Sequence, residues 1–495
     1  MKRDKILLIY AGIKDVLVLP MGILHLGAYL LKFGHNVELI DARFDKFEDS
    51  VFVNCLVVGI SVLTGQQIEI GLKISKKVKE ISPKTKVVWG GVHPTLLPEE
   101  TVSHENIDVV VKGDGELTFK ALVDCFIEKK NIHNVRGICF KDEEGTIINN
   151  PEAEYFDLDI IPPLPYSMLK NFDKYESYNI FPFHISRGCP GRCTFCYNNQ
   201  KKSFKKWRSY SAVRVLKDIE RVVLKYNPSA LRIVDDQALL NKKLIRSIAQ
   251  GFIDNNWKFK WIANTTLDCW ANYDIETIKL LVKSGLKQLR FGGESGSNKI
   301  LKIIKKTHEL KHFFRALTIC NKFNIRVQIS FLIGVHNETK YDVKFTLRLI
   351  DKLRKNPYNI FFRIFRLNPY PNTEIFNTAV ELGFRHPTSL EGWGRYNTTS
   401  LKTLPWVSKK RFRKLGLIAL ISDMIVRNEF SISNAIFVDS LKKGPKFHFS
   451  LNLNDLLTQF LYLDAKMRWK LKLFNLAPEW VLMNKIINKQ SATLN

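Results

Sequence analysis

Three cysteines lie close together near the middle of the chain, in Ser186-Arg187-Gly188-Cys189-Pro190-Gly191-Arg192-Cys193-Thr194-Phe195-Cys196-Tyr197. A structural zinc site takes four protein ligands, and no fourth cysteine stands nearby. Three thiolates on a [4Fe–4S] cluster leave one iron open to bind and reduce another molecule. The spacing therefore predicts that Cys189, Cys193 and Cys196 hold a cluster with a chemical role. An incomplete zinc knuckle and simple buried thiols are the alternatives.

The cysteines follow the first strand of a series in which short apolar strands alternate with amphipathic helices. The predicted strands are at Ile185 and at residues 231–234, 261–264, 288–291, 326–333 and 360–367. This series predicts a partial (β/α)6 barrel, shorter than a full eight-unit barrel of ~250 residues. Barrel enzymes place their chemistry at the carboxyl ends of the strands, so the position of the cysteines fits a catalytic site.

An earlier strand–helix series covers residues 5–125. We predict strands at residues 6–9, 36–40, 56–61, 86–89 and 107–111, and helices at residues 23–33 and 68–81. Short apolar strands separated by helices predict an α/β fold in which a parallel sheet has helices on both faces. We expect this doubly wound, flavodoxin-like domain to bind its ligand at the carboxyl ends of its strands.

The chain of 495 residues is too long for one ordinary core. We predict an α/β domain over residues 1–143, a linker rich in proline and aromatic residues over 144–183, the barrel over 184–390 and a mainly helical region over 391–495. In the last region helices are expected at residues 409–426, 451–463 and 465–473. These basic helices would cap the barrel as a lid or rest on an anionic membrane.

The composition is that of a globular protein, with 45% hydrophobic and 25% charged residues. The five cysteines outside the triplet are scattered, which indicates buried thiols in a reducing compartment. The N-terminus resembles no signal peptide, and no continuous apolar window is long enough to span a bilayer. We therefore expect a cytoplasmic protein, with peripheral contact at the membrane surface as the alternative.

The net charge of +28 is typical of proteins that bind nucleic acid. The chain nevertheless contains no recognisable nucleic-acid module, and its lysines are spread over the whole length. The basic excess is sharp between residues 187 and 208, which include no acid, and again from Lys402 onward. Because the first run adjoins the cysteines, we interpret it as a sign of an anionic cluster and an anionic substrate more than of nucleic acid.

The C-x3-C-x-aromatic-C pattern, with Phe195 as the aromatic residue, resembles the cluster motif of radical S-adenosylmethionine (SAM) enzymes. The chain is similar over about residues 1–390 to the class with an N-terminal cobalamin-binding domain, which includes methyltransferases and anaerobic porphyrin-ester cyclases. The resemblance implies that the three cysteines ligate a [4Fe–4S] cluster, that SAM binds the fourth iron, and that Phe195 packs near the adenine. An external reductant of the flavodoxin or ferredoxin type would supply the electron that cleaves SAM to a 5′-deoxyadenosyl radical.

Two further segments resemble SAM-binding elements of this family. The stretch Phe291-Gly292-Gly293-Glu294-Ser295-Gly296-Ser297 resembles a G-x-E-S-G-S segment, which implies SAM contacts by three of its residues: Gly293, Glu294 and Ser295. Asp235-Asp236 ends a predicted strand and resembles a D-D-x-F segment, which implies a contact by Asp236. The following Gln237-Ala238 departs from that pattern, so a solvated strand end is the alternative.

The first domain resembles one half of a cobalamin-binding pattern. Ser61-Val62-Leu63 and Gly90-Gly91 end two predicted strands, similar to an S-x-L…G-G pair whose small residues admit the flat nucleotide tail of cobalamin. The resemblance implies cobalamin contacts by Ser61, Leu63, Gly90, Gly91, His93, Thr95, Gly113 and Glu116. The D-x-H-x-x-G half is missing, because the loop at residues 11–16 has no histidine. Cobalamin would then bind without a histidine from this loop on cobalt, and a flavodoxin-like domain without cofactor is the alternative.

Together these resemblances imply a cobalamin-dependent radical SAM methyltransferase that acts on an unactivated carbon of a small-molecule or lipid-like substrate. A radical SAM oxidative cyclase, or another C–H oxidation enzyme in which cobalamin transfers no methyl group, is the first alternative. A basic nucleic-acid- or membrane-binding protein with a structural cluster is the second. The sequence indicates no catalytic residue beyond the three cysteines.

Overall fold

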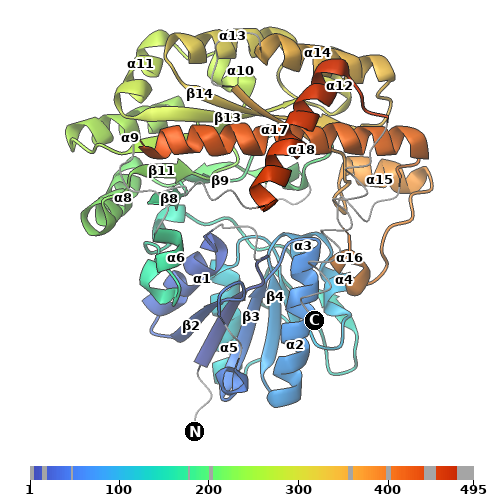
Figure 1. Ribbon diagram of the computed structural model, residues 1–495. Coiled ribbons are helices and arrows are strands. Elements are labelled where there is room, and N and C mark those ends of the chain that lie inside the picture. Colours follow the sequence, from blue (N-terminus) through green and yellow to red (C-terminus); the bar gives the residue numbers. More distant parts are fainter. Residues whose placement is uncertain are drawn as a thin grey trace. The chain divides into compact units, whose positions relative to one another are not determined.

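Figure 1 shows a computed structural model of the chain, which describes residues 5–13, 19–45, 48–176, 179–199, 205–354, 360–396, 403–439 and 453–475. The chain forms two compact units. The first comprises Met1–Trp261 and Asn368–Leu401, and the second comprises Ile262–Leu367 and Lys402–Asn495.

The first unit is built on a seven-stranded sheet of order β2-β1-β3-β4-β5-β6-β7 (Figure 1). Strands β1 to β5 are parallel, whereas β6 and β7 are antiparallel to their neighbours. The strands are Lys5–Tyr10 (β1), Asn36–Asp41 (β2), Cys55–Ser61 (β3), Lys86–Gly90 (β4), Val109–Val111 (β5), Ile138–Lys141 (β6) and Ile147–Asn149 (β7). All five strands predicted for this region are confirmed, and β6 and β7 are additions that the sequence analysis did not predict.

Helices cover both faces of this sheet. Residues 6–9 of β1 are completely buried in succession, which requires cover on both faces of the strand. The longer helices are α1 (Met21–Lys32), α2 (Gln66–Ile81) and α5 (Glu116–Glu128), with the shorter η1 (Asp49–Phe52), α3 (Val92–Leu96) and α4 (Pro98–Val102) between them. The expected doubly wound α/β fold is confirmed.

A linker and the beginning of a second sheet complete the first unit. The linker contains three short helices, η2 (Leu158–Ile160), η3 (Tyr166–Met168) and α6 (Asp173–Glu176). Strand β8 (Ile180–Phe183) pairs in parallel with β11 (Ala230–Ile233), and β9 (Ser186–Arg187) pairs antiparallel with β10 (Arg208–Ser209). Among the residues that the structure describes in this part, the helices are η4 (Tyr197–Asn199), α8 (Ala212–Tyr226), α9 (Lys242–Asp254), α15 (Glu374–Glu381) and α16 (Leu390–Gly394).

The strand that we predicted at Ile185 is misplaced. The strand before the cysteines is β8, and Ile185 lies beyond its end. Pro182 in the middle of this strand disguises it, because proline removes a backbone N–H that a sheet uses. Strand β8 lies at the edge of its sheet, where the missing donor is tolerated.

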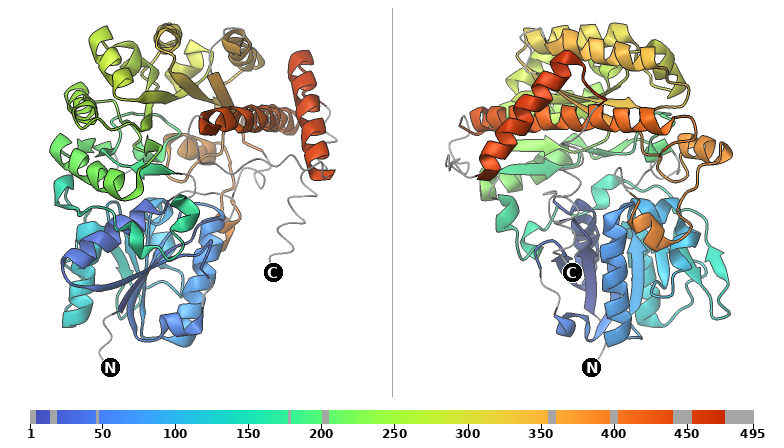
Figure 2. Two further views of the ribbon diagram at one scale, coloured as in Figure 1. Left: turned by 60° about the vertical axis from the view of Figure 1, so that its left-hand side comes forward. Right: turned by 45° about the vertical axis from the view of Figure 1, so that its right-hand side comes forward.

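The second unit contains the later strand–helix repeats (Figure 2). Strand β12 (Lys260–Thr265) spans the boundary between the units, and β13 (Leu286–Glu294), β14 (Arg326–Ile333) and β15 (Ile360–Arg366) pair in parallel. Between them lie α10 (Leu267–Ala271), α11 (Ile275–Lys283), α12 (Asn298–Ile303), α13 (Leu310–Lys322) and α14 (Lys340–Arg354). The predicted order of strands in the barrel region is confirmed apart from the first.

Two long helices follow in the second unit. Helix α17 (Lys409–Asp439) contacts β15, and α18 (Leu453–Leu471) contacts α17. The two helices predicted at residues 451–463 and 465–473 are the single helix α18, while residues 451 and 452 lie outside the described residues. Within the helix, Asp464 pairs with Arg468 one turn later, at 2.7 Å, a spacing that supports a continuous helix.

Across the residues described, no helix is both long and apolar enough to cross a lipid bilayer. The domain boundaries at residues 143, 183 and 390 stay a prediction, because the two units group the chain by contacts and not by fold.

Candidate active site

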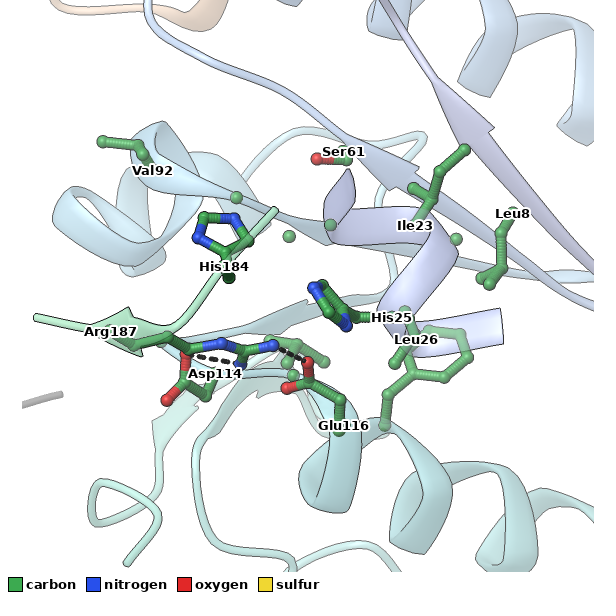
Figure 3. A pocket seen from close by; sticks show the side chains of 18 of the residues that line it. Leu8, Ile23, His25, Leu26, Ser61, Val92, Asp114, Glu116, His184 and Arg187 are labelled. Carbon is green, nitrogen blue, oxygen red and sulfur yellow. Dashed lines mark hydrogen bonds and ion pairs between the residues drawn. The ribbon is translucent and has the colours of Figure 1, made fainter. Parts of the chain in front are cut away.

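A cavity of about 390 Å³ lies in the first unit at the carboxyl ends of its parallel strands (Figure 3). Ser61 at the end of β3 pairs in register with Gly90 at the end of β4, and both line this cavity. Five of the eight residues predicted to contact cobalamin line it: Ser61, Gly90, Gly91, Gly113 and Glu116. We call this space the strand-end cavity.

Replacing Gly91 by any other residue would force a local rearrangement of the backbone. Its φ is +101°, a conformation that side chains with a Cβ rarely adopt. A Cβ at this position would lie 2.5 Å from the carbonyl oxygen of Val62. The absence of a side chain lets β3 and β4 meet at the rim, where the Val62 N–H donates to the Gly90 carbonyl at 3.0 Å.

Thr95 does not line the cavity but connects two loops that do. Its hydroxyl donates to the Gly91 carbonyl at 2.7 Å and accepts from the Gly113 N–H at 3.0 Å. Because Thr95 is only 1% exposed, these bonds are shielded from water. Thr95 therefore positions the glycine loops.

The other two predicted cobalamin residues also lie away from the cavity lining. Leu63 is 46% exposed. His93 is completely buried, with Nδ1 3.0 Å from the Thr64 hydroxyl and its ring against Trp393. Burial lowers the pKa of His93 to about 3, so the imidazole is neutral.

An ion-pair network lies beside the cavity (Figure 3). Arg187 donates to Asp114 at 3.2 Å and to Glu116 at 2.7 Å, and Arg208 also pairs with Asp114. Burial acts to raise the pKa of Asp114, but the charges of Arg187 and Arg208 outweigh it and hold that pKa below its ordinary value. These two arginines belong to the basic run that we interpreted as facing an anion. Carboxylates of the protein already neutralise them, and Lys201 and Lys202 of that run lie outside the described residues.

Two histidines that the sequence analysis did not single out also line the cavity. His25 in α1 is 7% exposed, and neither ring nitrogen has a hydrogen-bond partner. Its ring centroid lies 5.8 Å from that of His184, whose Nδ1 is 3.3 Å from Asp235 (Figure 3). Burial, and then the charge of Arg187, lower the pKa of His25 well below its usual value. The sequence signal that could have revealed His25 is its place as a lone histidine among the apolar residues in the first turns of α1.

The three cysteines of the triplet are partly buried, and none is in a disulfide. A Cβ on Gly191 would lie 3.3 Å from the sulfur of Cys189 and 3.9 Å from that of Cys193, so both sulfurs approach this glycine. Burial raises the pKa of Cys196 to about 12. In the part of the chain that the structure describes, no three His, Cys, Asp or Glu residues are grouped to hold one metal ion. A [4Fe–4S] cluster does not require that grouping, since each thiolate binds a different iron.

Asp236 lines the strand-end cavity near the triplet, whereas Phe195 is a partly buried residue of the triplet loop. Burial raises the pKa of the Asp236 carboxyl, while a hydrogen bond from Asn198 opposes this shift. Asn198 itself is buried and lines the cavity. The turn after Cys196 therefore contributes to the same wall as Asp236.

The remaining predicted SAM residues belong to the second unit, at the end of β13. Glu294 has a φ of +59° at a break in the β13–β14 register, and its carboxylate lies 3.2 Å from the Lys306 ammonium. Ser295 is completely buried, with its hydroxyl 3.3 Å from that of Thr346. The Gly293 carbonyl lies 3.1 Å from Nε2 of His308. This loop is braced by partners within its own unit.

Comparisons with known proteins bear on the whole chain. Residues 183–350 match the radical SAM superfamily, and residues 15–123 match the B12 binding domain. An uncharacterized methyltransferase of Pyrococcus horikoshii is 30% identical over 437 residues, which cover 84% of this chain and 92% of the relative. An anaerobic magnesium-protoporphyrin IX monomethyl ester cyclase of Synechocystis is 26% identical, over 62% of each chain.

Two solved structures are similar in fold. The cobalamin-dependent SAM radical enzyme OxsB, with aqua-cobalamin and SAM bound, has a TM-score of 0.73 at 19% identity and covers 99% of this chain and 75% of its own. The radical SAM methyltransferase TsrM from Kitasatospora setae, with tryptophan and a SAM analogue bound, has a TM-score of 0.66 at 15% identity, over 77% and 76%. These likenesses support the predicted fold class for both strand–helix regions.

Proposed function

Because this chain belongs to the family of radical SAM enzymes with a B12-binding domain, we propose that it is a methyltransferase acting on an unactivated carbon of a small molecule. Its substrate would be a small molecule or a lipid-like compound. An external one-electron reductant would be its protein partner.

The composition of the strand-end cavity carries this proposal. Ser61 and Gly91 contribute to one wall, at the edge of the first sheet. His184 and Tyr197 contribute to another wall, and they flank the cysteine triplet in the sequence. A cofactor resting on the strand ends would thus lie next to the loop of the triplet. A reaction that uses two cofactors on one substrate needs such adjacency.

The residues of the cavity rim fit the cofactor that the family implies. Ser61 and Gly90 leave the ends of β3 and β4 free of bulky side chains, and Gly91 brings bare backbone to the rim. A flat, amide-rich cofactor such as cobalamin needs this close approach. We infer that cobalamin would be held by Ser61, Gly90, Gly91 and Gly113.

The triplet fits an iron–sulfur cluster. Gly191 leaves room between the sulfurs of Cys189 and Cys193, and no disulfide occupies the three thiols. Cys189, Cys193 and Cys196 would ligate three irons, and SAM would be contacted by the predicted set Phe195, Asp236, Gly293, Glu294 and Ser295.

When bound, the cluster with SAM would supply a radical that abstracts hydrogen, and cobalamin would supply a transferable methyl group. The chain itself holds and shields these groups. His25 is neutral, so it adds hydrogen-bonding capacity to the cavity without a charge. Asp235 accepts from the backbone N–H of Ile185 and from the Ser186 hydroxyl, which fixes the chain just before the triplet.

An oxidative cyclase is the second candidate, because similar cyclases match about two thirds of this chain. The same cavity and cluster loop would serve it.

Product analysis distinguishes the two candidates. The enzyme is reconstituted anaerobically with iron, sulfide and cobalamin, reduced, and incubated with SAM and candidate substrates. A product heavier by one methyl group supports the methyltransferase, and a product lighter by two hydrogens supports the cyclase. Absence of SAM cleavage by a fully loaded, reduced cluster would contradict both.

A further inference from the structure

A second, smaller cavity of about 140 Å³ adjoins the strand-end cavity within the first unit. His25 and His184 line both cavities and so form their common wall. The rest of its lining comes from the linker at residues 162–167, from the end of β8, from Tyr210 just before α8 and from one face of α8. We call this space the side chamber. None of the predicted cofactor contacts falls in it.

Three polar side chains of the side chamber have buried atoms without a hydrogen-bond partner. They are both ring nitrogens of His25, the hydroxyl of Tyr210 and Oδ1 of Asp218. His25 is 7% and Tyr210 is 4% exposed, so neither is solvated as a surface group would be. A buried polar atom without a partner destabilises the folded chain, and a ligand with acceptor atoms would satisfy the donors of His25 and Tyr210, although not the Asp218 oxygen, which is itself an acceptor.

The charge of the side chamber is positive. Arg214, Arg221 and Lys225 project from the lining face of α8 at helical spacing, with Asp218 as the only acid of the lining. Oδ2 of Asp218 accepts a hydrogen bond from Arg214 at 2.9 Å. Among the residues that the structure describes, Arg221 and Lys225 make no ion pair within 4 Å; Arg221 acts on Asp218 only through its charge, and the Lys225 ammonium lies 5.1 Å from the centre of the Tyr226 ring. Both side chains are exposed. Two cations are therefore left for an incoming anion.

The donors further inside suit the same kind of ligand. Burial raises the pKa of Tyr210 to about 12, so its hydroxyl keeps its proton and can donate. The neutral imidazole of His25 has one N–H donor. Oxygen acceptors of a carboxylate or a phosphate would match these two donors, with Arg221 and Lys225 balancing the charge. The side chamber, at about 140 Å³, has room for a compact anionic group.

We propose that the side chamber binds the carboxylate or phosphate group of the substrate. A substrate anchored there would lie against His25 and His184, beside the strand-end cavity, and this positioning rests on the proposed function. The chemistry that recognises the anion is common to both groups, and only binding measurements separate them.

The test uses the reconstituted holoenzyme without turnover. Inorganic phosphate and acetate are titrated separately by calorimetry at constant ionic strength. We expect saturable binding of at least one anion, and which of the two binds identifies the group. The double variant Arg221→Gln/Lys225→Gln should weaken this binding roughly tenfold, the effect of about 1.4 kcal/mol. Tyr210→Phe should weaken it a few-fold with the thermal unfolding midpoint unchanged.

Lys217→Gln is the matched control, because Lys217 is an exposed cation of α8 that does not line the side chamber. Equal weakening by Lys217→Gln would show a general charge effect and overturn the proposal. Absence of saturable binding of either anion would overturn it as well. SAM cleavage is measured on the same samples. A preparation that cleaves SAM but binds neither anion overturns this inference alone, whereas one that binds an anion but cleaves no SAM contradicts only the proposed function.

Discussion

The two units each contain a glycine-rich strand end, and the two behave differently. In the first unit, the end of β4 with Gly90 and Gly91 lines a cavity. In the second unit, the end of β13 carries Glu294 and Ser295, whose side chains meet partners of that unit. The same sequence signal thus marks a close approach to the backbone in both places. In both places the approaching atoms belong to the protein, since a Cβ on Gly91 would meet Val62 and one on Gly293 would meet Phe313, and the end of β4 also lines a cavity.

The largest expected effect concerns the ion pairs beside the first strand end. Arg187→Gln leaves the buried carboxylate of Glu116 without its cation and the partly buried Asp114 with Arg208 alone, and we expect a loss of about 3 kcal/mol in the free energy of unfolding. Urea unfolding measures it. Arg192→Gln removes an exposed cation of the same basic run and should change stability by less than about 0.5 kcal/mol. Equal losses of unfolding free energy in the two variants would show that the ion-pair network stabilises the protein no more than an exposed cation does.

Gly91→Ala tests whether the first strand end needs its glycine. The new Cβ would contact the Val62 carbonyl at a positive φ, so we expect a loss of about 3 kcal/mol in stability. Gly34→Ala is the control, since Gly34 also has a positive φ but no atom within 4 Å of the place that an added methyl group would take. That variant should lose only about 1 kcal/mol. Similar losses would mean that backbone strain alone, and not the close approach at the rim, is responsible.

Each strand end has a buried histidine nearby, and the pH dependence of stability should reveal it. The pKa of His93 is lowered to about 3 by burial, while the unfolded chain binds a proton near pH 6.5. The unfolded state therefore takes up more protons below pH 6.5, and the folded state loses stability as the pH falls from there toward 3. His93 should account for about 2 kcal/mol between pH 7 and pH 5.

His93→Gln should remove that share of the pH dependence of stability. In the second unit, burial lowers the pKa of His308 to about 4, so His308→Gln should remove a comparable share. His133→Gln, at an exposed position, is the control. Urea unfolding at pH 7 and pH 5 gives the difference. If the pH dependence of stability is unchanged in His93→Gln, the lowered pKa of His93 is refuted as its source.

The smallest expected effect comes from removing the threonine hydroxyl that braces each strand end, and cobalamin binding should distinguish the two ends. Thr95→Val removes the hydroxyl that joins the Gly91 and Gly113 loops, and Thr346→Val removes the acceptor for the Gly296 N–H. Each should cost about 1 kcal/mol in stability. Only Thr95→Val should also weaken cobalamin binding, measured by equilibrium dialysis, because its loops line the strand-end cavity. Unchanged cobalamin affinity in Thr95→Val would argue against a positioning role for this residue.

Much of the first unit follows from local pattern. The strands β1 to β5 are short apolar runs, and such runs are recognisable because a sheet covered on both faces buries every residue. Strand β8 was misplaced because Pro182 contradicts the local rule, and only its place at the sheet edge permits it. We predict two helices where α18 is one because Asp464 interrupts the apolar pattern, although the spacing of Asp464 and Arg468 is itself a helical one that the sequence contains.

The candidate site divides in the same way. The triplet Cys189, Cys193 and Cys196 and the pair Gly90–Gly91 are contiguous in sequence, so their chemistry can be proposed from spacing. His25 comes from α1, whereas His184 and Arg187 come from the segment directly after β8, and they meet because these two segments flank one cavity. The placement of Thr95 and His93 outside that cavity could not be predicted either, since one residue step around a short helix turns a side chain from ligand to core.

The sequence by itself determined the fold class, the family and the cluster triplet, because periodicity, glycine positions and thiol spacing are local properties of the chain. The tertiary structure alone decided which polar groups are left unpartnered. It neutralised Arg187 with Asp114 and Glu116, braced Ser295 with Thr346, and left His25 and Tyr210 facing the side chamber. The physical reason is that hydrogen bonds and ion pairs depend on distances between segments remote in sequence, which no local pattern specifies.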